Sequence, residues 1–129
     1  MNGNHLILIV DDEPEILKLY SLKLQKSGFE VTTAENGQRG IESALGQRKP
    51  DLILMDVKMP VMDGIEAFTK LRENPETKDI KIVFLTAFND LRIPEIDVKV
   101  AREIGAAGFI KKGIDLDEFV TKIRQVLAS

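Results

Sequence analysis

Acidic side chains follow two apolar runs of this sequence. Asp56 comes directly after the run at residues 52–55, and Asp11 and Asp12 come directly after the run at residues 6–10. Carboxylates brought together repel one another unless a cation lies between them, and oxygen ligands without histidine or cysteine nearby favour Mg²⁺, or alternatively Mn²⁺. Such an ion beside a spare carboxylate suggests phosphoryl transfer, in which an aspartate attacks in line while the ion draws charge from the phosphoryl oxygens.

Two more groups suited to phosphoryl chemistry follow later apolar runs. Thr86 directly follows the run at residues 80–85 and offers a hydroxyl donor. Lys111 and Lys112 follow the run at 107–110, and a lysine there offers a cation for an oxyanion. The carboxyl ends of parallel strands meet at one edge, where open α/β sheets place their chemistry. The acids, the hydroxyl and the cation are therefore predicted to face one site.

Taken singly, each of these groups has an ordinary structural explanation. The acidic pair would compensate a helix dipole, the threonine would be a β-branched strand residue, and the lysine would be a surface group. Asp63 and Asp115 are predicted to be solvated turn formers or helix N-caps. The chemical interpretation is favoured because acids, hydroxyl and cation all fall at the same end of the predicted strands.

Five segments are predicted strands and five are predicted helices. The strands are residues 5–10, 29–33, 52–55, 80–85 and 107–110. The helices run from Pro14 to Ser27-Gly28, from Asn36-Gly37 to Leu45, through Ile65, Phe68 and Leu71 to Asn74-Pro75, through Val100, Ala101 and Ile104, and over 116–127. This alternation indicates a doubly wound parallel sheet covered on both faces. The common order for five strands, 2-1-3-4-5, would make the ends of the first and third strands neighbours.

Composition limits the classes of function. The 129 residues suit one domain, and a net charge of −3 gives no electrostatic footprint for direct nucleic-acid binding or for an anionic membrane. The sequence has no cysteine, which excludes disulfides and thiolate metal sites. The apolar run at residues 6–10 is too short for a signal peptide or a membrane-spanning helix. A cytoplasmic protein without membrane insertion is the expectation.

The sequence resembles the receiver domains of two-component response regulators over nearly its whole length. The matching residues are Val10-Asp11-Asp12-Glu13, the stretch Asp-Val-Lys-Met-Pro-Val-Met-Asp-Gly at 56–64, Leu85-Thr86-Ala87, and Gly105-Ala106 through Phe109-Ile110-Lys111-Lys112. The D-x-x-M-P-x-M-D-G segment is the most specific of them. The resemblance implies one receiver domain over residues 1–129 with a flavodoxin-like fold.

The resemblance also implies roles in phosphorylation. Asp56 would be the phosphoacceptor, taking a phosphoryl group from a sensor histidine kinase or a histidine phosphotransfer protein. Asp11 and Asp12 would hold Mg²⁺ together with Asp56 and the backbone carbonyl of Lys58. The domain would not be an enzyme with a separate substrate, because it would catalyse only its own phosphorylation and dephosphorylation.

Further roles concern the response to the phosphoryl group. The resemblance implies that Thr86 and Lys112 contact the phosphoryl oxygens, and that Phe109 is an aromatic switch that turns inward when Thr86 moves. Gly105-Ala106 and Phe109 set the register that selects Lys112 over Lys111. Phosphorylation would thereby reshape a docking face for a downstream target protein.

Two departures from the family pattern bear on this interpretation. Gly113 stands where the family usually has a proline after a cis peptide bond. A non-proline cis bond costs roughly 3 kcal/mol, so a trans bond and a less firmly placed Lys112 are expected. The segment 88–98 is longer than the family pattern. Lys58 and Phe88 would tune the lifetime of the acyl phosphate.

Three functions follow as hypotheses. Since the sequence ends at Ser129, directly after the last predicted helix, the first is a stand-alone receiver that switches protein docking or relays phosphate. The second is a receiver-fold interaction module that works without phosphorylation. The third is a Mg²⁺-dependent phosphatase with an aspartyl-phosphate intermediate. It is disfavoured because Asp11-Asp12-Glu13 lacks the D-x-D pattern of haloacid-dehalogenase-type enzymes.

Overall fold

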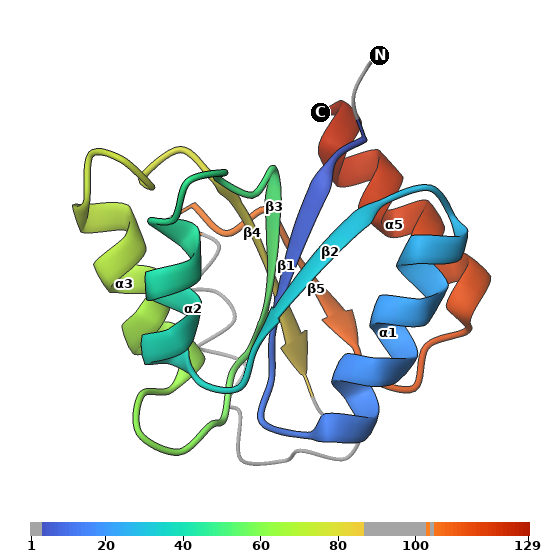
Figure 1. Ribbon diagram of the computed structural model, residues 1–129, viewed down its shortest axis with the longest axis horizontal. Helices are drawn as coiled ribbons and strands as arrows, with labels where there is room; N and C mark the ends of the chain where they lie inside the picture. Colours follow the sequence, from blue (N-terminus) through green and yellow to red (C-terminus); the bar gives the residue numbers. More distant parts are fainter. Residues whose placement is uncertain (1–3, 87–102, 104) are drawn as a thin grey trace.

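The computed structural model describes residues 4–86, 103 and 105–129, and its five strands form one parallel sheet (Figure 1). The strands are β1 (Leu6–Val10), β2 (Glu30–Ala34), β3 (Leu52–Asp56), β4 (Lys81–Thr86) and β5 (Gly108–Lys111). Their order is β2-β1-β3-β4-β5 with parallel pairing throughout. The predicted flavodoxin-like topology is confirmed, and each predicted strand lies within about one residue of its observed position.

Helices cover both faces of this sheet. The described helices are α1 (Pro14–Lys26), α2 (Gly37–Ala44), α3 (Gly64–Glu73) and α5 (Leu116–Ala128). Helices α1 and α5 lie on one face, and α2 and α3 lie on the other (Figure 1). Four of the five predicted helices are thus confirmed. The one expected through Val100, Ala101 and Ile104, like the longer segment 88–98, lies outside the described residues.

The core has two halves because successive residues of a strand point to opposite faces. Leu8 and Ile53 pack on the side of α2 and α3, whereas Ile9 and Leu54 pack on the side of α1 and α5. Every residue of β1 and β3 is buried, as expected for central strands of a sheet covered on both faces. These two strands therefore form a rigid support for whatever lies at their carboxyl ends.

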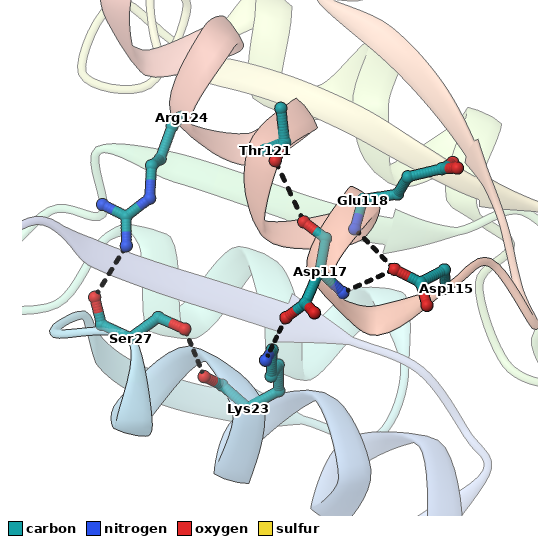
Figure 2. Close-up of polar contacts among 7 residues, drawn as sticks. All are labelled: Lys23, Ser27, Asp115, Asp117, Glu118, Thr121 and Arg124. Carbon is teal, nitrogen blue, oxygen red and sulfur yellow. Dashed lines mark hydrogen bonds and ion pairs between the residues drawn. The ribbon is translucent and has the colours of Figure 1, made fainter.

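Polar contacts join the C-terminal end of helix α1 to helix α5 (Figure 2). The Nζ atom of Lys23 lies 2.7 Å from Oδ1 of Asp117, and a guanidinium nitrogen of Arg124 donates to the carbonyl of Ser27 over 3.0 Å. Between them the helices bury Tyr20, whose ring stacks on Phe119 with 4.3 Å between ring centroids. We call this set of contacts the α1–α5 seam.

The predicted N-caps are confirmed. Asp63 accepts a hydrogen bond from the backbone of Glu66 at the start of α3, and Asp115 accepts from the backbones of Asp117 and Glu118 at the start of α5. Both acids therefore serve the helices rather than the site. None of the helices described in this structure is both long enough and apolar enough to span a bilayer.

Candidate functional site

Three carboxylates meet at the carboxyl ends of β1 and β3. One oxygen from each of Asp11, Asp12 and Asp56 lies within 4.8 Å of the others. Asp11 is fully buried and Asp56 is 5% exposed, while Asp12 is exposed. Strands β1 and β3 are neighbours in the sheet, which is the arrangement that the predicted strand order required. We call these three residues the acidic cluster.

The backbone around the acidic cluster is tightly constrained. The amide of Asp11 donates to the carbonyl of Ala34 over 3.0 Å, and Oδ1 of Asp11 accepts from the amide of Glu13 over 2.8 Å. On the other strand, Gly64 opens α3 against the backbone of β3, and a Cβ atom there would lie 2.1 Å from the carbonyl oxygen of Asp56. Glycine is required at this position because no side-chain atom fits.

Lys112 contacts two members of the acidic cluster. Its Nζ atom lies 2.8 Å from Oδ2 of Asp11, 3.3 Å from Oδ2 of Asp56 and 3.1 Å from Oε2 of Glu13, and the residue is 9% exposed. The neighbouring Lys111 is exposed. The structure thus places at the cluster the lysine that the register selected.

The bond between Lys112 and Gly113 is trans, as expected, and Gly113 has φ +90°. The accompanying expectation of a loosely placed lysine is wrong, because three carboxylates hold its ammonium. Glycine adopts positive φ at little steric cost, so the chain turns directly after the lysine without a proline.

Glu13 is a site residue that the sequence interpretation did not assign. It was noted only as part of the matching segment 10–13, yet it contacts Lys112 from 99 positions away in the chain. The available signal was its place directly after the acidic pair and before Pro14, which fixes it at the start of α1.

Burial governs the charges of the site. Burial, with the charge of Asp11 as a second cause, raises the pKa of Asp56 to about 7, although Lys112 opposes both effects. Burial also raises the pKa of Asp11. Burial by itself would lower the pKa of Lys112, but the contacts with Asp11 and Asp56 raise it above its ordinary value. The acidic cluster is therefore short of positive charge even with the lysine in place.

The stability of the unliganded protein should depend on Asp56 and pH. Since the folded state holds a proton on Asp56 that the unfolded state releases near its ordinary pKa of 3.8, stability from this group falls as pH rises through about 7. Asp56→Asn removes the titration. With a chelator present, the melting temperature of Asp56→Asn minus that of wild type should increase from about pH 5 to about pH 8. A difference independent of pH would contradict the raised pKa.

The structure places the two predicted switch residues on one face of the sheet. Thr86 ends β4 half-buried, and its carbonyl accepts from the amide of Lys112 over 2.7 Å. Phe109 pairs with Phe84 across β4 and β5, and their rings stack with 5.6 Å between centroids. Thr86 shares that face because it lies two residues after Phe84. Phe88 lies outside the described residues.

The donor set of the acidic cluster fits a hard divalent cation. All three side chains offer carboxylate oxygens that already converge, which is the ligand type preferred by Mg²⁺ and Mn²⁺. Lys58 is exposed two residues after Asp56, on the segment that leads to α3. Asp11, Asp12 and Asp56 are thus the side chains that could hold such an ion.

Known proteins resemble this chain in sequence and in fold. The chain is 35% identical over 122 residues to PilH of Pseudomonas aeruginosa, covering 95% of this chain and 97% of that protein. Its fold matches chemotaxis protein CheY4 of Vibrio cholerae with a TM-score of 0.85 at 28% identity, covering 96% and 99% of the two chains. The first curated relatives that it matches are longer regulators, and the chain spans about half their length.

A further solved structure with a similar fold contains a metal ion. It is the receiver domain of sensor histidine kinase PA1611 from Pseudomonas aeruginosa, with a TM-score of 0.84 at 27% identity, covering 98% and 100% of the two chains, and it holds a magnesium ion in its active-site cleft. The family profile of the response regulator receiver domain matches residues 7–124 of the present chain. The chain therefore belongs to the response regulator receiver domains of two-component systems.

Proposed function

We propose that this protein is a phosphorylation-controlled switch in which Asp56 accepts a phosphoryl group from a histidine kinase or a histidine phosphotransfer protein. One observation carries the proposal. Asp56 lies buried at the end of a central strand, with the carboxylates of Asp11 and Asp12 close by and the ammonium of Lys112 at 3.3 Å. This arrangement has a nucleophile, a place for a cation and a fixed positive charge.

The proposed reaction is a single displacement at phosphorus. An Oδ atom of Asp56 donates an electron pair to phosphorus and forms an O–P bond, while the N–P bond of the donor phosphohistidine breaks and the imidazole leaves with its electron pair. Lys112 compensates the charge on the phosphoryl oxygens from its position beside both Asp11 and Asp56. Thr86 supplies a hydroxyl donor at the end of the neighbouring strand.

Mg²⁺ is the proposed cofactor. Asp11, Asp12 and Asp56 would hold it together with the backbone carbonyl of Lys58, and Mn²⁺ has the same ligand preference. When bound, the ion would neutralise charge on the carboxylates and on the transferred phosphoryl group. The magnesium ion in the related PA1611 receiver domain supports this assignment.

The proposed output is a change in protein docking. A phosphoryl group on Asp56 would draw the hydroxyl of Thr86 toward it, which vacates space for Phe109 on the same face of the sheet. Phe109 is half-buried at the edge strand, so an inward rotation alters a surface that a target protein can read. Relay of the phosphoryl group to a phosphotransfer protein would use the same acceptor.

A small-molecule donor tests this proposal. The wild-type protein, incubated with acetyl phosphate and Mg²⁺, is expected to gain one phosphoryl group by intact mass, and Asp56→Asn is expected to gain none. Asp63→Asn is a matched control because Asp63 caps α3 outside the acidic cluster. No gain in wild type, or a gain that survives Asp56→Asn, would refute the proposal.

A further inference from the structure

The ammonium of Lys112 has three carboxylate neighbours with different relations to the acidic cluster. Asp11 and Asp56 belong to the cluster, where a cation and a phosphoryl group would engage their oxygens. Glu13 lies outside the cluster, and its side chain is 53% exposed with Oε2 at 3.1 Å from Nζ. Among the described contacts, Glu13 is thus the carboxylate that remains for Lys112 once the other two are engaged.

The backbone of Glu13 is fixed by its neighbours. Its amide donates to Oδ1 of Asp11, and its carbonyl accepts the first helical hydrogen bonds of α1. The following Pro14 restricts Glu13 to an extended conformation, and its φ of −93° and ψ of 110° fall there. Glu13 occupies the N-cap position, yet its side chain makes no capping hydrogen bond. The carboxylate is therefore available to Lys112.

The backbone of Lys112 is held relative to Glu13 by the α1–α5 seam. Helix α1 begins directly after Glu13, and α5 begins four residues after Lys112, so the packing of the two helices limits how far apart these two residues can lie. The ion pair of Lys23 with Asp117 joins the last turn of α1 to the first turn of α5 (Figure 2). The contact between Glu13 and Lys112 is a second polar link, between the segments that lead into the two helices.

We propose that Glu13 is a positioning residue that holds the ammonium of Lys112 at the margin of the acidic cluster, so that the lysine does not occupy the place of the cation. The inference rests on the proposed function of the site. Without the carboxylate of Glu13, Lys112 would pair with Asp11 and Asp56 alone. A divalent cation would then have to displace the lysine before binding, and its affinity would fall.

Mg²⁺ affinity of the unphosphorylated protein is the direct readout. Titration calorimetry is expected to show that Glu13→Gln raises the dissociation constant of Mg²⁺ about fivefold or more, because the lysine then competes fully for the cluster. Glu15→Gln is the matched control: it removes the same charge from the first turn of α1 at an exposed position. That control should change the constant by less than about twofold, the effect of an exposed charge in salt.

Repeating the measurement in the Lys112→Met variant separates the positioning of Lys112 by Glu13 from the simple loss of a negative charge. In Lys112→Met, where no lysine competes, Glu13→Gln should change Mg²⁺ affinity by less than about twofold. An equal effect of Glu13→Gln in both backgrounds, or an equal effect of Glu13→Gln and Glu15→Gln in wild type, would overturn the inference. The second comparison needs no Lys112 variant, so it decides the matter even where Lys112→Met does not fold.

The outcomes distinguish this inference from the proposed function. If Glu13→Gln weakens Mg²⁺ binding in wild type but not in Lys112→Met, while Asp56 is not phosphorylated, the positioning role stands and the phosphoacceptor role is refuted. Phosphorylation of Asp56 with equal effects of Glu13→Gln and Glu15→Gln would do the reverse. A wild-type protein that binds no Mg²⁺ would refute both the metal assignment and the positioning role.

Discussion

Replacing Lys112 by methionine is expected to slow phosphorylation of Asp56 by about 100-fold, the usual effect of removing one fixed donor that stabilises developing charge. Lys112 is the positive group nearest the acceptor among the described residues, with Nζ 3.3 Å from Oδ2 of Asp56. Methionine keeps an unbranched side chain that is one atom shorter, and it removes the charge and the hydrogen bonds of the ammonium. The measurement is the rate of phosphoryl incorporation from acetyl phosphate at saturating Mg²⁺.

Lys111 provides the matched control for this variant. It carries the same charge one position earlier, ends β5 and is exposed. The phosphorylation rate of Lys111→Met should therefore stay within about twofold of wild type, because solvent screens an exposed charge. A large loss in Lys111→Met with little effect of Lys112→Met would show that the assigned register of β5 is wrong.

Replacing Gly64 by alanine is expected to destabilise the protein by about 1–3 kcal/mol, the range for overpacking a closely packed site. The added Cβ would lie 2.1 Å from the carbonyl oxygen of Asp56, so α3 and the end of β3 would have to separate. Alanine otherwise favours helix over glycine by about 1 kcal/mol, so a loss of stability would run against helix propensity. Urea unfolding measures the effect.

The same substitution should impair the site. Separation of α3 from β3 moves the backbone of Asp56, and with it the acceptor relative to Asp11 and Lys112, so slower phosphorylation should accompany the loss of stability. Gly108→Ala is the control, since a Cβ at Gly108 would meet no atom within 4 Å. Unchanged stability of Gly64→Ala would mean that α3 does not approach Asp56 as closely as described.

The sheet was predictable because its strands are strongly patterned. Residues 52–56 are all buried, and a run of four apolar residues closed by an acid and a turn has few other interpretations. The order of the strands came from the statistics of parallel folds, and the register then brought Asp11 and Asp56 together. The N-caps at Asp63 and Asp115 were predictable because capping depends on local sequence.

The contact of Glu13 with Lys112 was not predictable in the same way. It joins residues 99 positions apart, and its geometry depends on how α1 and α5 pack. The expectation of a loosely placed Lys112 failed for a related reason: it considered the backbone at Gly113 and left out the carboxylates that hold the ammonium. Local sequence indicates which groups are present, whereas tertiary packing decides which of them share a proton or a cation.

The central claim is that Asp56 carries the phosphoryl group, and chemical trapping tests it most directly. Reduction of the phosphorylated protein with borohydride converts an acyl phosphate to an alcohol, which turns the modified aspartate into homoserine. Mass spectrometry of the peptides should locate homoserine at position 56 and at no other acid of the cluster. Homoserine at position 11 or 12, or its absence from all three positions, would contradict the account.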